Sequence, residues 1–152
     1  MEQNKEQLMV AALENGSVID HIPTDKLFTI VQLLQLDKFD NEIIIANNLN
    51  SKVMTKKGLI KISEKFFNEE EISKLAVVCP NIRLTVIRNY NVAEKREINL
   101  PETLNDIVKC ANPVCITNNE PMRTYFNINN ATRSAKCRYC GKEQSLDNIK
   151  LK

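Results

Sequence analysis

The stretch CANPVC at residues 110–115, followed by CRYC at residues 137–140, decides the fold of the last third of this 152-residue chain. Cys110 and Cys115 are separated by four residues, Cys137 and Cys140 by two, and twenty-one residues lie between the pairs. Two such pairs on separate turns can converge on one tetrahedral ion, with zinc–sulfur bonds of about 2.3 Å. The spacing therefore predicts a small β domain of zinc-ribbon type that needs one structural zinc ion to fold.

Two other chemistries compete for these cysteines. A thioredoxin-like redox pair would place Cys137 and Cys140 at the start of a helix, whereas Gly141 and the alternating residues nearby favour a turn between strands. A disulfide framework conflicts with a cytoplasmic setting. Four thiolates also leave no open position for water or substrate, which is typical of a structural zinc site. The fifth cysteine, Cys79, lies among apolar residues at helical spacing and is interpreted as a core residue.

The composition is that of an ordinary globular protein, with 43% hydrophobic and 26% charged residues. Twenty-one basic and nineteen acidic residues leave a net charge of +2, which is too balanced to indicate nucleic-acid binding by bulk charge. The longest apolar run, Leu8–Leu13, is too short for a membrane span or a secretory signal. We therefore expect a cytoplasmic protein with neither a nucleic-acid nor a membrane partner.

The composition changes near Asn99–Pro101, which predicts one domain over residues 1–100 and a second over residues 101–152. In the first domain, alternation over Val18–Ile22 predicts a strand that ends at Pro23. Pro23 and Thr24 then start a predicted helix. Its apolar residues at i, i+3, i+4 and i+7 are Leu27, Ile30, Val31 and Leu34.

The rest of the first domain continues as strands around a second helix. Asn68 and Glu71 have capping-box spacing, and the helix that follows stops at Pro80. The predicted strands are Ile43–Ala46, which we expect to be buried, and Leu59–Ile62, Ile82–Ile87 and Val92–Ile98. The β-α-β-β-α-β order with one extra strand predicts a ferredoxin-like α+β sandwich, with helices on one face of a mainly antiparallel sheet.

The sequence lacks the motifs of common enzyme classes. It contains neither a GxxxxGK[ST] loop nor a GxGxxG fingerprint, and no Ser-His-Asp or Cys-His arrangement is readable. Its one histidine, His21, lies beside Asp20, and such an isolated pair is more often structural than catalytic. We therefore expect a protein that is not an enzyme.

Several segments resemble the regulatory chain of aspartate carbamoyltransferase, nearly end to end and in order. They are GSVIDHIP at 16–23, KKGLIKI at 56–62, NYNVAEK at 89–95, LPE at 100–102 and the four-cysteine domain. The resemblance implies a non-catalytic subunit of pyrimidine biosynthesis with a nucleotide-binding domain and a zinc domain that docks on the catalytic chain. It also implies a homodimer, three of which join two catalytic trimers, with CTP as the usual inhibitor, often helped by UTP, and ATP as the usual activator.

The resemblance also nominates nucleotide-binding residues. Asp20, His21, Lys61 and Lys95 would contact the nucleotide, and Lys57 would lie near the ribose or a second nucleotide. Leu13, Tyr90 and Val92 would line the base pocket. A triphosphate carries about four negative charges near neutral pH, which lysines can match as point charges.

Two positions depart from the family pattern, and the zinc domain has its own nominated surface. Thr85 stands where Asn is common, and SKVM at 51–54 stands where a Gly-Glu pair is common. By resemblance, the docking surfaces are the loop Cys110–Cys115 with Asn112 and the knuckle with Arg138, Tyr139 and Glu143.

Two other functions compete with this interpretation. A zinc-ribbon nucleic-acid-binding protein is the first alternative, although the C-terminal domain is rich in neutral amides and lacks interleaved basic and aromatic residues. A small metal-dependent enzyme is the second, and the closed four-thiolate site disfavours it.

Overall fold

The computed structural model describes residues 13–152, which form two compact units. The first unit comprises the chain up to Asn68 together with Val78–Asn99, and the second comprises Glu69–Val77 together with Leu100–Lys152. The apolar run Leu8–Leu13 lies outside the described residues except for Leu13. No helix within residues 13–152 is long and apolar enough to cross a membrane.

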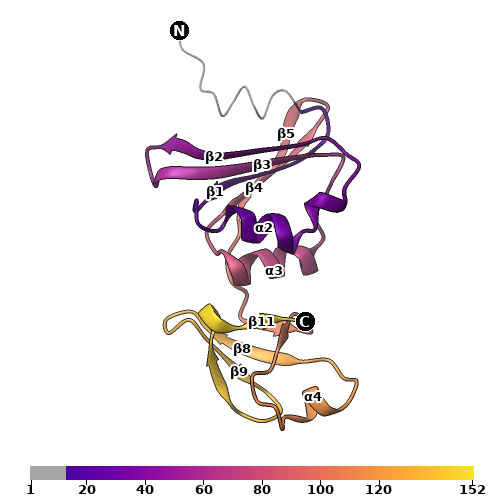
Figure 1. The fold of residues 1–152 in the computed structure, drawn as a ribbon, viewed down its shortest axis with the longest axis vertical. Coiled ribbons are helices and arrows are strands. Elements are labelled where there is room, and N and C mark those ends of the chain that lie inside the picture. The colour runs from indigo at the N-terminus through magenta and orange to yellow at the C-terminus, as the bar shows by residue number, and fades with distance from the viewer. Residues whose placement is uncertain (1–12) are drawn as a thin grey trace. The chain divides into compact units, whose positions relative to one another are not determined.

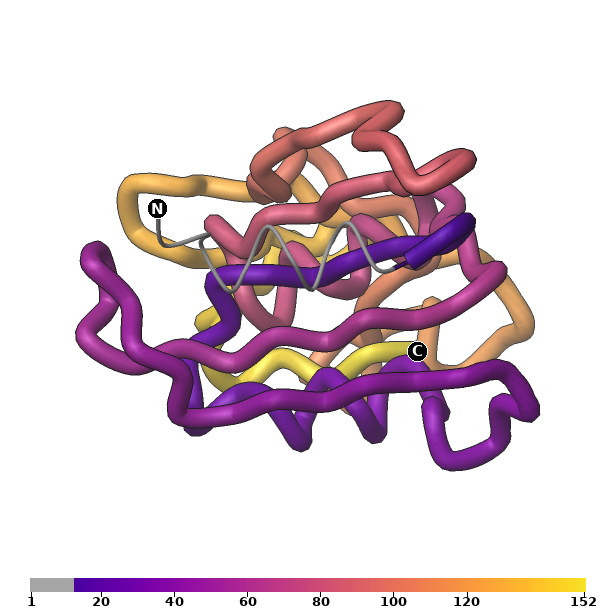
Figure 2. The backbone as a smooth tube through the Cα atoms, turned by 90° about the horizontal axis from the view of Figure 1, so that it is seen from above, coloured from indigo at the N-terminus to yellow at the C-terminus, as the bar shows by residue number. Residues whose placement is uncertain are grey.

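The first unit is built on a five-stranded sheet in the order β2-β3-β1-β4-β5, in which every neighbouring pair is antiparallel (Figures 1 and 2). In chain order its elements are β1 (Gly16–Ile22), α2 (Leu27–Leu33), the 3-10 turn η1 (Leu36–Lys38), β2 (Ile43–Ser51), β3 (Thr55–Ser63), β4 (Arg83–Arg88) and β5 (Asn91–Glu97). Helix α3 (Glu69–Val78) lies between β3 and β4 in the chain and, up to Val77, is part of the second unit. The order of elements, with β1 and β3 central and β5 added at an edge, confirms the predicted ferredoxin-like α+β class.

Helix α2 begins three residues later than the sequence predicts. The backbone N–H of Lys26 donates to the carbonyl of Pro23 at 2.9 Å, which closes a turn before the first helical residue, Leu27. Leu27 and Ile30 are buried, and a Cβ added to Gly58 of β3 would lie 3.0 Å from the Leu27 side chain. Gly58 has no side chain and therefore leaves room for Leu27, so α2 packs closely against this face of the sheet (Figure 1).

The expectation that Ile43–Ala46 is a buried strand is wrong. The segment begins β2, which extends to Ser51 and lies at the edge of the sheet with β3 as its one neighbour. Ile44 is 36% exposed and Ile45 is 42% exposed. A run of β-branched apolar residues predicts a strand, but it does not distinguish a central strand from an edge strand with exposed apolar side chains.

The second unit combines a four-stranded antiparallel sheet, β10-β9-β8-β6, with a two-stranded ribbon, β11-β7. Its elements after α3 are β6 (Thr103–Asn105), β7 (Val108–Lys109), α4 (Ile116–Asn119), β8 (Tyr125–Asn129), β9 (Ser134–Cys137), β10 (Glu143–Ser145), the 3-10 turn η2 (Leu146–Asn148) and β11 (Lys150–Leu151). Phe126 is fully buried at the centre of this unit. The same buried cluster contains Cys110, Cys115 and Cys137, so three of the thiols are part of the core.

Candidate functional site

Four cysteine side chains of the second unit converge on one point. Their Sγ atoms all lie within 4.8 Å of one another. Cys110 directly follows β7 and Cys115 directly precedes α4, so one short loop carries both. Cys137 ends β9, and Cys140 lies in the turn that leads to β10. The structure thus brings together all four residues that the spacing nominated as metal ligands.

The distances between the sulfur atoms fit a four-coordinate metal. The Sγ atoms of Cys110 and Cys140 lie 3.7 Å apart, and those of Cys115 and Cys137 lie 3.8 Å apart. A tetrahedron of thiolates around zinc, with bonds of about 2.3 Å, has edges of roughly 3.8 Å. None of the five cysteines forms a disulfide. Both the donor set and its size therefore suit a divalent ion.

Metal binding would change the ionisation of the thiols. Burial raises the pKa of the Cys110 thiol to about 12 and also raises the pKa of Cys137. A hydrogen bond from the Lys142 backbone lowers the pKa of the more exposed Cys140 to about 6. Metal ligation requires thiolates, so a bound divalent ion would displace the protons that burial otherwise holds on Cys110 and Cys137.

The Cys137–Cys140 pair lies in a tight turn between two strands. The backbone N–H of Gly141 donates to the carbonyl of Cys137 at 2.9 Å, and Gly141 has φ +76°, in the left-handed region that favours glycine. The predicted turn is therefore confirmed. A thioredoxin-like pair starts a helix, and these two residues do not.

Side-chain amides hold the loop that carries the other two ligands. The Asn118 amide donates to the carbonyls of Cys110 at 2.9 Å and Asn112 at 2.7 Å. The neighbouring Asn119 donates to the carbonyl of Cys115 at 2.8 Å. Outer hydrogen bonds of this kind orient metal ligands and tune affinity. The two amides thus preorganise the loop for metal binding.

A row of residues in register crosses the five-stranded sheet of the first unit. Lys61 on β3 lies opposite Val18 on β1, Val18 lies opposite Thr85 on β4, and Thr85 lies opposite Lys95 on β5. Directly opposite residues of antiparallel strands share a face, so Lys61 and Lys95 point to the same side. Side chains alternate along β3, which places Lys61 on the face opposite Gly58 and α2. Three interstrand steps of about 4.8 Å separate the two lysine Cα atoms by roughly 14 Å.

An ion pair lies at the end of β1, where the strand is irregular. Lys57 is 1% exposed, and its Nζ lies 2.9 Å from Oδ1 and 3.2 Å from Oδ2 of Asp20. The register of β1 shifts between Ile19 and Ile22, and His21 adopts φ 60° within that shift. The His21 backbone N–H donates to Asp20 Oδ1 at 2.7 Å, and its Nδ1 lies 3.5 Å from Oδ2. The bulge therefore brings two of the nominated residues, Lys57 and His21, to the carboxylate of a third, Asp20.

The remaining nominated residues lie around the same face. Lys61 is 6% exposed, and Val92 lies opposite Ile87, which follows Thr85 by two positions on β4. Tyr90 lies in the β4–β5 turn, where its backbone N–H donates to the carbonyl of Glu14 at 2.9 Å. A small buried cluster comprises Leu13, Val18, Leu59 and Ile87. The structure thus brings Leu13 next to the row, whereas Tyr90 and Val92 remain exposed at its rim.

Comparison with known proteins finds the same family over both parts of the chain. Residues 8–99 match the family described as aspartate carbamoyltransferase regulatory chain, allosteric domain, and residues 102–150 match the family described as its metal binding domain. An aspartate carbamoyltransferase regulatory chain of Phocaeicola vulgatus is 57% identical over 152 residues, which cover 99% of this chain and 98% of the relative. The regulatory chain of Bacteroides fragilis is 53% identical over 152 residues, which cover 99% of each chain. That of Pyrococcus horikoshii is 38% identical over 146 residues, which cover 94% of this chain and 96% of the relative.

This chain belongs to the aspartate carbamoyltransferase regulatory chain family. The resemblance carried by its motifs is therefore confirmed. As a regulatory chain it is a non-catalytic subunit of an enzyme of pyrimidine biosynthesis, with an allosteric domain and a metal-binding domain, and it associates with the catalytic chain. The four-cysteine cluster falls within the metal-binding match, and the lysine row falls within the allosteric match.

The residues that support the four-cysteine cluster of this regulatory chain are not evident from cysteine spacing. Asn118 and Asn119 look like ordinary neutral amides in the sequence, although they follow Cys115 by three and four residues, within reach of the loop carbonyls. Gln144 accepts from the backbone N–H of Ala111 at 2.7 Å and donates to the carbonyl of Lys109 at 3.2 Å. Gln144 gave no sequence signal, because its partners lie more than thirty residues away.

Proposed function

We propose that this regulatory chain binds the nucleoside triphosphates CTP, UTP and ATP as allosteric effectors, on the sheet face opposite α2. The observation that carries the proposal is the row that places Lys61 and Lys95 on one face, in register across β3, β1, β4 and β5. A triphosphate with about four negative charges needs fixed cations, and lysine is a common phosphate ligand. Residues 1–100 would form the nucleotide-binding allosteric domain, and residues 101–152 the zinc domain.

The other residues near the row have complementary roles in this proposal. Lys61 and Lys95 contact phosphates, and Lys57 neutralises Asp20, whose carboxylate and the adjacent His21 then contact the sugar or base. Leu13, Tyr90 and Val92 line the base pocket. The buried apolar cluster around Leu13 supports this assignment, because a nucleobase stacks on apolar surface more readily than on charged groups.

Calorimetric titration of the zinc-loaded chain with CTP tests the site. Lys61→Ala should weaken binding at least about tenfold, because it removes a charge-assisted contact of roughly 1.5–3 kcal/mol. Lys56→Ala is the matched control, since Lys56 lies on the same strand, is exposed and donates to Asn50. Equal CTP affinity of the parent chain and Lys61→Ala would place the site elsewhere, and hydrolysis of CTP by the pure chain would contradict a purely allosteric role.

We further propose that the metal is zinc, one ion per chain, held by Cys110, Cys115, Cys137 and Cys140. The support is the all-sulfur donor set and sulfur separations of 3.7 and 3.8 Å, which match the edges of a zinc–thiolate tetrahedron. Zinc in such a closed site is structural. The free thiols also support a reducing, cytoplasmic setting for the chain.

The proposed quaternary structure has three regulatory dimers that join two catalytic trimers. Dimerisation through the N-terminal sheet is supported by its edges. The β2 edge carries the exposed Ile44 and Ile45, whereas the β5 edge is mostly charged or polar. An exposed apolar edge strand is a template for pairing with a second copy.

We assign docking on the catalytic chain to the two segments that carry the cysteines, the Cys110–Cys115 loop and the Cys137–Cys140 knuckle. Val114, within the Cys110–Cys115 loop, is 81% exposed, and Tyr139, within the Cys137–Cys140 knuckle, is 51% exposed. Both belong to segments held by the cysteine cluster, so a bound metal would fix their positions. The nominated polar residues Asn112 and Arg138 lie on the same segments, and Glu143 begins β10 just after the knuckle. Arg138 stacks over the Tyr125 ring at 4.7 Å, which orders its side chain.

A further inference from the structure

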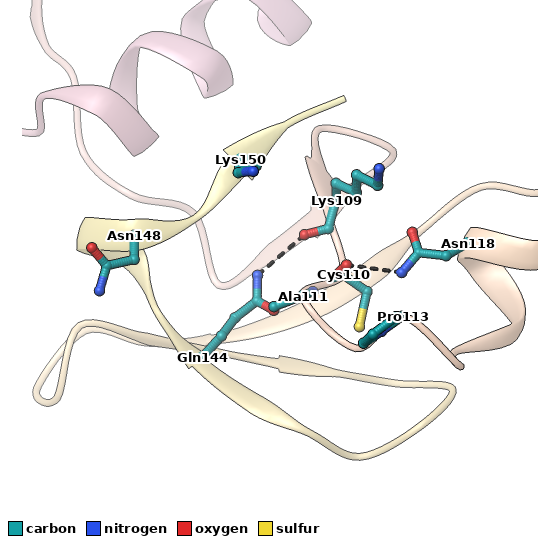
Figure 3. A pocket seen from close by; sticks show the side chains of 8 residues that line it. All are labelled: Lys109, Cys110, Ala111, Pro113, Asn118, Gln144, Asn148 and Lys150. Carbon is teal, nitrogen blue, oxygen red and sulfur yellow. Dashed lines mark hydrogen bonds between the residues drawn. The ribbon is translucent and has the colours of Figure 1, made fainter.

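A pocket of about 420 Å³ lies beside the metal loop in the second unit (Figure 3). It is bordered by the ribbon β7–β11, by the loop that follows Cys110 and by the first turn after β10. Its lining residues are Lys109, Cys110, Ala111, Pro113, Asn118, Gln144, Asn148 and Lys150. None of these residues is acidic, so the pocket's charge comes from its two lysines.

The two lysines lie directly opposite one another on the ribbon. Lys150 of β11 is the register partner of Lys109 of β7, so the two side chains share a face. Like charges in this position destabilise a strand pair. Within residues 13–152, no ion pair joins either ammonium to a carboxylate. The arrangement is one that an external anion would stabilise.

The amides around the pocket are held in place by the backbone. The side-chain amide of Asn118 donates to the carbonyls of Cys110 and Asn112. One N–H of Gln144 donates to the carbonyl of Lys109 (Figure 3). The Gln144 oxygen accepts from Ala111. The groups left to meet a ligand are the two ammoniums, the second N–H of Gln144 and the exposed amide of Asn148. Most of these groups are donors, which selects for an acceptor with negative charge.

The pocket is continuous with the loop to which docking is assigned. Cys110 and Pro113 line it, and the exposed Val114 is the next residue of the same loop. We propose that this pocket receives an acidic side chain of the catalytic chain when the two chains assemble. The proposal rests on the proposed docking function. It adds a charged contact formed by Lys109 and Lys150 to the apolar contacts of Val114 and Tyr139.

Assembly with cognate catalytic trimers tests the pocket, with sedimentation velocity of zinc-loaded chains at low and high salt as the measurement. The double variant Lys109→Gln/Lys150→Gln should weaken assembly about tenfold at low salt, and the deficit should shrink at high salt because salt screens the contact. Lys109→Glu/Lys150→Glu should weaken it further by repelling the acidic group. The matched control, Lys52→Gln/Lys56→Gln, removes the same charge from exposed positions of the first unit and should assemble as the parent does.

The outcomes distinguish a failure of the pocket from a failure of the docking function. If the parent chain assembles and the double variant assembles within about twofold of it at low salt, the pocket does not receive the partner. If the parent chain itself fails to assemble, the docking function fails. A third arm titrates inorganic phosphate into the isolated chain and follows the amide signals of residues 109 and 150. Saturation at submillimolar phosphate, with assembly unaffected by the variants, would assign the pocket to a small anion and overturn the proposal.

Discussion

The four-cysteine cluster of the second unit comes from two short segments, 110–115 and 137–140. The lysine row of the first unit comes from four strands between Val18 and Lys95. The ligands of the cluster are neighbours in sequence, and three of them are also core residues. The row depends on strand register, and its lysines lie on the face away from α2. The cysteine cluster is therefore part of the core of its unit, whereas the lysine row lies on a sheet whose core is formed by other residues.

This difference predicts opposite responses to mutation. Removing a metal ligand should unfold the second unit, because its thiols fill the core around Phe126. Removing a lysine of the row should cost ligand affinity and leave the fold intact. The largest expected effects thus belong to the cluster, and the smallest to the edges of the sheet.

Cys137→Ser should have the largest effect. Cys137 is fully buried, and structural zinc contributes on the order of 10–16 kcal/mol of apparent binding energy in small domains. We expect loss of zinc by metal analysis and loss of dispersed NMR signals from residues 100–152, while signals from β1, β3 and β4 persist.

Cys79→Ser is the matched control, since Cys79 is also buried but lies outside the cluster. It should keep one zinc per chain. A chelated parent chain that retains the dispersed signals of residues 100–152 would show that the second unit folds without metal, and would remove the contrast between the units.

The next largest effect should come from Asp20→Ala, which removes an ion-pair partner of the buried Lys57. Breaking a buried pair on one side typically costs about 3–5 kcal/mol, because the buried ammonium of Lys57 loses the counter-charge that Asp20 supplies. Urea unfolding of the zinc-loaded chain, followed by amide signals of β1 and β3, measures the loss.

Glu94→Ala is the control for this prediction, since Glu94 lies on β5 of the same unit. Its partner Arg96 lies 4.0 Å away at the surface, and such exposed pairs contribute only up to about 1 kcal/mol. If Asp20→Ala costs no more than Glu94→Ala, the first unit does not depend on the pair.

The same difference explains why the sequence alone located the four cysteines but not the lysine row. Cysteine spacing alone located Cys110, Cys115, Cys137 and Cys140, because metal ligation is local and few residue types can do it. Lys61 and Lys95 came only from resemblance, since the register that aligns them through Val18 and Thr85 is a property of the folded sheet.

The fold class followed from periodicity, and most element positions followed with it. Periodicity could not predict that Ile44 and Ile45 are exposed, because an apolar run has the same pattern at the centre of a sheet and at its edge. It also could not supply the Lys57–Asp20 pair, whose members lie thirty-seven residues apart. The start of α2 was displaced by the turn that Pro23 and Lys26 close.

Asn118→Ala should have an intermediate effect. It removes the two hydrogen bonds that hold the Cys110–Cys115 loop, and loss of such outer contacts typically lowers metal affinity by about 10–100-fold. Competition with a chromogenic chelator measures zinc affinity. Asn130→Ala, at an exposed turn, is the control and should match the parent; an unchanged affinity for Asn118→Ala would mean that the cysteines alone set the geometry.

Ile45→Lys should have the smallest effect on the isolated chain. It places a charge on the exposed β2 edge without touching the core, so it should leave the unfolding free energy of the first unit nearly unchanged. The dimer should weaken, because lysine on an edge strand opposes pairing with another edge. Sedimentation equilibrium measures this. A dimer as tight as the parent's would show that the chains pair through another surface.

In the proposed function, nucleotides bound by one unit act on a catalytic chain docked by the other. The most direct test of this coupling is sedimentation velocity of this chain with cognate catalytic trimers, with CTP effects on aspartate saturation measured on the same samples. With zinc present, we predict a large complex whose apparent aspartate affinity shifts with CTP by the several-fold to hundredfold that a coupling of about 1–3 kcal/mol produces. Chelation should release the trimers and abolish the CTP effect together. A CTP effect that survives chelation, or the absence of any complex when zinc is bound, would contradict this coupling between the two units.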